Sequence, residues 1–141
     1  MSKSTINKTV FFNATRETVW AYLTEKDKLG MWFHPPKKNL TEGEAYELMR
    51  TYDDGQKKKV CWGTVLEMNP HEKMVWTFTV SPLNGSLTTV TWTLEEVLCG
   101  TRLTLKHEGI EAAAGEAAMG MLTALDAGWD EHFDNWRKAI A

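Results

Sequence analysis

The chain ends in LDAGWDEHFDNWRKAIA, where acids and a histidine stand close enough to suggest a metal site or an acid–base pair. An α-helix turns about 100° per residue, so Asp126, Asp130 and Asp134 would lie together on one flank of a helix. His132 would lie on the opposite edge of the neighbouring aromatic stripe, and its neighbours at three and four residues are not usual metal ligands. We therefore expect no metal site here, and we expect Asp130, Glu131 and His132 to lie outside any cavity.

The four histidines of the chain are His34, His71, His107 and His132, on a predicted loop, turn, strand end and helix. Their spacing is not that of metal ligands, and the chain has neither a GxSxG motif nor a glycine-rich phosphate loop, so no metal or other cofactor is predicted. Strand alternation points His107 inward. There it would bind the polar group of a ligand or be satisfied by a neighbouring protein group, and both readings stay open.

The apolar residues of the last helix form a single stripe, within about 40° of Trp129 on the helical wheel. The members of this stripe are Leu122, Leu125, Trp129, Phe133 and Trp136. Gly128 lies inside the same helix, where glycine costs about 1 kcal/mol relative to alanine. Its presence indicates that the backbone approaches another element closely there, or that room is needed.

The rest of the chain predicts the elements that position this helix. A strand at 5–12 is followed by a short helix, TRETVWAYL, with Thr15 as N-cap, and after at most another helical turn the chain becomes extended near His34. Four half-buried antiparallel strands follow, and a sheet with one apolar face needs a covering layer, which the last helix alone is long enough to provide. The residues expected to face that helix are Val60, Trp62, Thr64, Leu66 and Met68, then Met74, Trp76, Phe78 and Val80, then Val90, Trp92 and Leu94, and finally Thr101, Leu103, Leu105 and His107.

Composition limits the classes of protein and partner. The 141 residues, 43% hydrophobic and 25% charged, predict one globular domain over 1–141, and seven tryptophans indicate large apolar surfaces. A net charge of −3 argues against nucleic acid as a partner, and the run 57–59 (KKK) is expected to be the exposed start of a strand. No window is apolar enough for a membrane span or a secretion signal, so the location is expected to be cytoplasmic. Cys61 and Cys99 are expected to be free buried thiols, with a disulfide between them as the alternative.

Several motifs, in order, resemble a known family. These are ATRETVWAYLT, MWF, WGTVLEMNPHEKMVWTF, VTWTLEE, GTRLTLKHEGI and GWDEHFDNW, which together cover nearly the whole chain. The sequence is similar to stand-alone domains of the activator of Hsp90 ATPase homologue type, within the START and Bet v 1-like (SRPBCC) superfamily. The resemblance implies an α+β helix-grip fold, in which a curved antiparallel sheet grips a long C-terminal helix around an apolar cavity. Glu67 and Glu108 resemble acids retained in family members, but strand alternation does not bring them together.

The resemblance and the stripe together suggest a binding module for a small apolar or amphipathic molecule between the helix and the sheet. The residues expected to line its cavity are Trp32, Trp62, Trp76, Phe78, Trp92, His107, Leu122, Trp129 and Phe133. Tryptophans that serve only as core remain an alternative. A chaperone co-factor acting by protein contact is a second function, although the preceding domain and the Asn- and Trp-rich motif of the stimulating family members are not found in this sequence. A cyclase-like or hydrolase-like enzyme is a third, against which the absence of converging acids and bases argues.

Overall fold

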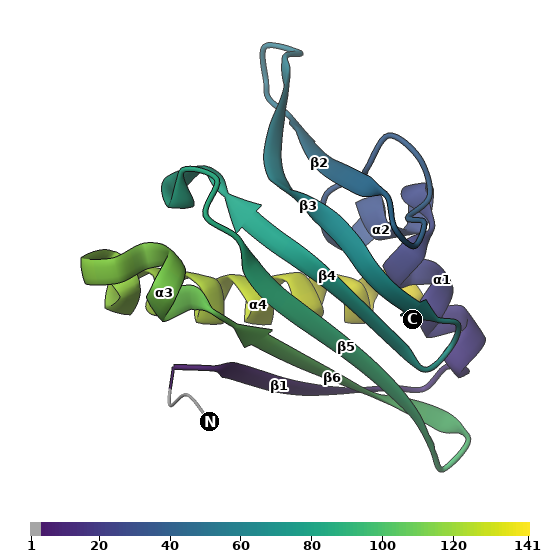
Figure 1. Cartoon of the computed structure of the whole chain (residues 1–141). Helices are drawn as coiled ribbons and strands as arrows, with labels where there is room; N and C mark the ends of the chain where they lie inside the picture. The colour runs from purple at the N-terminus through teal and green to yellow at the C-terminus, as the bar shows by residue number, and fades with distance from the viewer. Residues whose placement is uncertain (1–3) are drawn as a thin grey trace.

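The computed structural model describes residues 4–141 and has six strands and four α-helices within that range (Figure 1). The sheet is antiparallel throughout, with the strand order β1-β6-β5-β4-β3-β2. The elements in chain order are β1 (Ile6–Phe12), α1 (Arg16–Thr24), α2 (Lys26–Trp32), β2 (Ala45–Thr51), β3 (Lys57–Asn69), β4 (Lys73–Val80), the 3-10 helix η1 (Ser81–Leu83), β5 (Thr88–Val97), β6 (Gly100–Glu108), α3 (Ile110–Ala114), η2 (Gly115–Ala117) and α4 (Ala118–Ile140).

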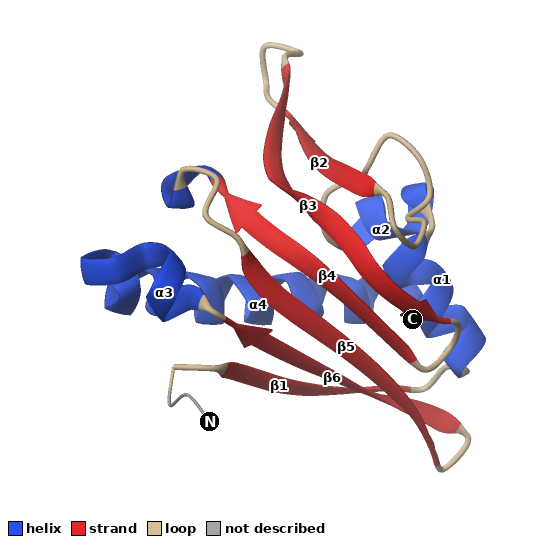
Figure 2. Cartoon of the chain, in the orientation of Figure 1, coloured by secondary structure: helices blue, strands red, loops and turns tan. Residues whose placement is uncertain are grey.

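The long helix α4 crosses one face of the sheet, and α1 and α2 cover the same face near the C-terminal end of α4 (Figure 2). Trp129, Phe133 and Trp136 of α4 are buried against the strands, as the stripe predicts. Lys8 of β1 helps to hold the helix in place, because its Nζ lies 2.6 Å from Asp126 Oδ1 and 3.0 Å from Asp130 Oδ1. The predicted α+β helix-grip architecture is therefore confirmed.

The first helix begins where its sequence predicts, and two elements differ from the prediction. Thr15 Oγ1 accepts a hydrogen bond from the Thr18 backbone N–H at 3.2 Å and caps α1. The segment after α1 forms a complete second helix rather than a single turn, because Leu29 and Trp32 gain burial against the core. Strand β2 was not predicted as a separate strand, and it pairs along β3 at the edge of the sheet.

The predicted inner face of β3 was wrong over most of its length. Cys61 and Val65 are buried toward the helices, whereas Trp62 lies on the outer face opposite Thr79, with Lys59 Nζ 4.3 Å from the centre of its ring. The pairing with β4 shifts by one residue between Val65 and Glu67, so Met68 again faces inward while Leu66 is exposed. A β-bulge reverses the side-chain alternation, and simple period-two counting does not detect it.

The cysteines are free, but only Cys61 is buried. Cys99 is exposed in the tight turn between β5 and β6, where Leu98 and Cys99 have positive φ angles of 49° and 69°. The expectation of a buried Cys99 was wrong because β5 ends at Val97 and β6 begins at Gly100, so Cys99 lies in the turn and not in a strand. The lysines at 57–59 are exposed at the start of β3, as predicted.

Candidate functional site

A pocket of about 210 Å³ lies between α4 and the strands β3 and β4, and the segment that follows α2 closes one side of it. Most of its wall is apolar or aromatic. The lining residues are Phe33, His34, Val60, Cys61, Phe78, Val80, Ala124, Leu125, Gly128, Trp129 and His132. Of the nine residues predicted to line a cavity, Phe78 and Trp129 belong to this set.

Two histidines supply the polar groups of the pocket. The ring centres of His34 and His132 are 5.5 Å apart, and the ring of Phe33 lies 4.5 Å from that of His132. Burial, with smaller contributions from His132 and Arg50, lowers the pKa of His34 to about 4. Burial also lowers the pKa of His132, despite the opposing influence of the Trp32 backbone and Glu131. Both imidazoles are therefore uncharged at neutral pH.

His132 contradicts the expectation that it lies outside the cavity. It follows Trp129 by three residues and Gly128 by four, so it shares a helical face with both. Leu125, Gly128, Trp129 and His132 have the spacing i, i+3, i+4 and i+7, and this row was the sequence signal for the pocket wall. Asp130 and Glu131 remain exposed, as predicted.

Gly128 provides room for the pocket. A Cβ atom placed on Gly128 would have no heavy atom within 4 Å outside its own helix turn. Of the two explanations for a glycine inside this helix, the structure therefore supports the need for space and not a close backbone approach. The neighbouring thiol of Cys61 is a poor nucleophile, because burial raises its pKa to about 12.

His107 is satisfied by its protein neighbours and does not line the pocket. Trp129 Nε1 donates to His107 Nδ1 at 3.1 Å, and His107 Nε2 lies 2.7 Å from Thr88 Oγ1. An indole N–H can only donate, so Nδ1 accepts and the proton of the neutral ring is on Nε2. Thr88 Oγ1 in turn donates to the Phe78 carbonyl at 2.6 Å. This chain fixes the orientation of Trp129, and the alternative in which His107 is satisfied by its neighbours is the correct one.

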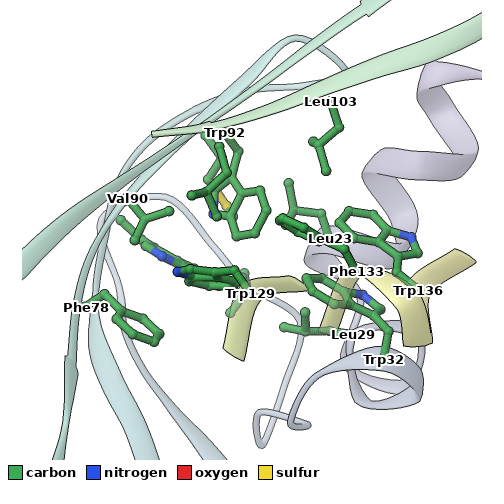
Figure 3. Close-up of a cluster of buried hydrophobic side chains, with 14 of the residues drawn as sticks. Leu23, Leu29, Trp32, Phe78, Val90, Trp92, Leu103, Trp129, Phe133 and Trp136 are labelled. Carbon is green, nitrogen blue, oxygen red and sulfur yellow. The ribbon is translucent and has the colours of Figure 1, made fainter. Parts of the chain in front are cut away.

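Of the other predicted cavity tryptophans, Trp32, Trp76 and Trp92 belong to a closed aromatic core, part of which Figure 3 shows, whereas Trp62 lies outside it. The rings of Trp32 and Trp136 stack at 4.1 Å, and Trp92 meets Trp32, Trp76 and Phe133 edge-on at 5.7–6.2 Å. Each of these side chains is at most 2% exposed. The cavity expected among Trp32, Trp76, Trp92 and Phe133 is therefore filled by the side chains themselves, and the pocket lies beside this core.

Leu122 was wrongly placed in the central cavity. It is half-buried and lines a separate surface hollow beside the residues 4–7 and Asp126. The acids Glu67 and Glu108 do not converge either: each pairs at 3.5 Å with a lysine of its own surroundings, Lys73 and Lys106 respectively. Within residues 4–141 no cluster of three His, Cys, Asp or Glu side chains has a geometry that could hold a metal ion. None of the helices in this range has the length and apolar character that crossing a bilayer requires.

The sequence over residues 13–141 matches the family model described as activator of Hsp90 ATPase homolog 1-like protein. No protein of curated function matches the chain. Solved structures resemble it at low sequence identity. CalU16 from Micromonospora echinospora is 22% identical with a TM-score of 0.77, and the match covers 97% of this chain and 76% of CalU16.

Two further solved structures match over almost their full length. CV1439 from Chromobacterium violaceum is 22% identical with a TM-score of 0.77, covering 99% of this chain and 98% of that one. MLL2253 from Mesorhizobium loti is 20% identical with a TM-score of 0.75, covering 96% of each chain. At these identities the similarity establishes a shared START and Bet v 1-like α+β fold.

Proposed function

This chain belongs to the activator of Hsp90 ATPase homolog 1-like family, and on that premise we propose that it binds a small, mostly apolar molecule in the pocket between α4, β3 and β4. The observation that supports this is the open space above Gly128, at the meeting point of three elements. Apolar pockets with a few convergent polar groups are typical ligand sites. We further propose a cytoplasmic location, because an exposed free thiol such as Cys99 is typical of a reducing compartment.

The size of the pocket limits the ligand. An apolar protein cavity of about 150 Å³ is large enough for benzene, and this pocket measures about 210 Å³. A molecule with one aromatic ring and a short substituent therefore suits it better than a long fatty acid chain. Binding of such a molecule would not require the tryptophans of the closed core to move.

The test replaces Gly128 by leucine, whose side chain would occupy much of the pocket. The helix should tolerate this change, because the Cβ position is free and leucine is a better helix former than glycine. We expect toluene to bind the wild type saturably, with a change in the fluorescence of Trp129, and Gly128→Leu to weaken binding at least about tenfold, since 1.4 kcal/mol of lost burial is sufficient for that. Isothermal titration calorimetry would measure the affinity.

Gly120→Leu is the matched control. Gly120 also lies in α4 and also has free space at its Cβ position, but it does not line this pocket. The control should bind toluene like the wild type. Equal affinity of Gly128→Leu and the wild type would contradict the proposal, as would the absence of saturable binding by any one-ring probe. The second outcome would favour the alternative of a chaperone contact.

Enzymatic activity of the cyclase or hydrolase kind is less well supported. No acidic side chain lines the pocket within the described part of the chain, and the Cys61 thiol stays protonated. The two neutral histidines could exchange protons with a ligand, but no charged side chain of the described pocket wall is placed to act with them. Ligand binding therefore accounts for the residues of the pocket without requiring additional catalytic groups.

A further inference from the structure

The polar groups of the pocket lie at one side of an otherwise apolar wall. His34 comes from the segment after α2 and His132 from α4, and their rings meet at 77° with centres 5.5 Å apart. His132 Nδ1 is buried and has no hydrogen-bond partner among the described residues. Leaving a buried polar atom unpaired is unfavourable, so a ligand group that hydrogen-bonds to it gains affinity.

The charges around the two rings determine which polar group suits them. Arg50 of β2 acts on His34, Glu131 of α4 acts on His132, and the uncharged thiol of Cys61 lines the same pocket from β3. Glu131 is exposed, and none of the lining residues in the described chain is acidic. A cationic ligand would therefore find no counter-charge inside. A carboxylate would lose its hydration without contacting a cation in the pocket wall, since both imidazoles are neutral and Arg50 does not line the pocket.

We propose that His34 and His132 form the polar end of this pocket, and that its ligand is a small aromatic molecule with one weakly acidic O–H group, bound in its uncharged form. Phenols and aromatic carboxylic acids share this chemistry. The O–H group donates to an imidazole nitrogen, and the ring packs against Phe78 and Trp129. This inference rests on the proposed binding function and specifies its ligand class.

The first experiment compares phenol with toluene, two probes of similar shape that differ in the hydroxyl group. Replacing His132 by phenylalanine keeps a ring and removes the polar atoms, so phenol binding should weaken about tenfold while toluene binding changes less than about twofold. His132→Gln retains a donor and an acceptor, and it should keep phenol affinity within about threefold of the wild type. His71→Phe, in the β3–β4 turn and outside the pocket, is the control and should change neither affinity.

The second experiment tests whether the ligand binds in its uncharged form. Benzoate should bind together with a proton, so its affinity should rise about tenfold for each unit by which the pH falls from 7.5 to 6. The proton uptake can be measured by calorimetry in buffers of different ionisation enthalpy. Phenol, already uncharged in this range, should bind without proton uptake. Benzylammonium should bind more weakly than benzoate at pH 6.

The outcomes separate this inference from the proposed function. If toluene binds the wild type and not Gly128→Leu, the pocket is a ligand site whatever the polar probes do. If phenol and toluene then respond equally to both His132→Phe and His132→Gln, or if benzylammonium binds as well as benzoate, the assignment of an acidic O–H ligand is wrong. If no probe binds, both proposals fail.

Discussion

At His107, a neutral imidazole connects three elements through hydrogen bonds. Trp129 of α4 donates to it, and on its other side lies Thr88, which donates to the Phe78 carbonyl of β4. Burial lowers the pKa of His107 to about 4. A second proton on the ring would turn Nδ1 into a donor facing the indole N–H, so protonation opposes the folded geometry.

This shift predicts how stability depends on pH. The ordinary pKa of histidine is about 6.5, so between pH 6.5 and 4 the unfolded chain binds a proton at His107 that the folded protein does not. The free energy of unfolding should therefore fall by about 3 kcal/mol from this group as the pH drops through that window. His34 and His132 act in the same direction.

Urea unfolding of the wild type and His107→Gln between pH 7.5 and 4 would test the prediction. Glutamine does not titrate in this range, so the variant should be less stable at pH 7 and should lose less stability on acidification. Its curve should approach that of the wild type near pH 4. Parallel curves would show that His107 is not the source of the dependence.

At the scale of the elements, side chains on different sides of α4 lie in different environments. Phe133 is 2% exposed and packs in the aromatic core, Leu122 is half-buried at a surface hollow, and Asp134 pairs with Arg137 at 2.7 Å in solvent. The extent of burial, and not the position along the stripe, should therefore decide how much stability is lost when each side chain is replaced.

Alanine substitutions at these positions should follow that order. We expect Phe133→Ala to lower the free energy of unfolding by about 3–5 kcal/mol, Leu122→Ala by less than about 2 kcal/mol, and Asp134→Ala by no more than about 0.5 kcal/mol. Urea denaturation would measure all three, with one common dependence of the free energy of unfolding on urea concentration. A loss at Leu122 as large as that at Phe133 would contradict the orientation of the helix.

At the scale of the whole molecule, the buried side chains of the sheet and of α1, α2 and α4 form one continuous core. Proteins with a single core of this size usually unfold in one cooperative step. We expect circular dichroism and tryptophan fluorescence to report the same melting temperature, with or without a chelator. Two separate transitions, or a clear drop in melting temperature with the chelator, would overturn the prediction of one metal-independent domain.

The sequence by itself determined that one long helix covers the apolar face of an antiparallel sheet, because long regular elements carry their burial pattern in their periodicity, and the resemblance to a known family implied the helix-grip fold. The stripe at Trp129, Phe133 and Trp136, the Thr15 cap and the inward residues of β4, β5 and β6 all depend on neighbours close along the chain. The inward orientation of His107 followed from the same alternation. Such local regularities are fixed by backbone geometry.

Only the tertiary structure decided which buried residues leave space between them. Trp62 lies on the outer face because bulges in β3 follow from its pairing with β2 and β4, which no single strand encodes. Periodicity identified the tryptophans as buried but not as a closed cluster, because ring packing depends on four elements meeting at once. The pocket of His34, Cys61, Gly128 and His132 unites segments almost 100 positions apart, and its volume is set by how the helix and the sheet fit together.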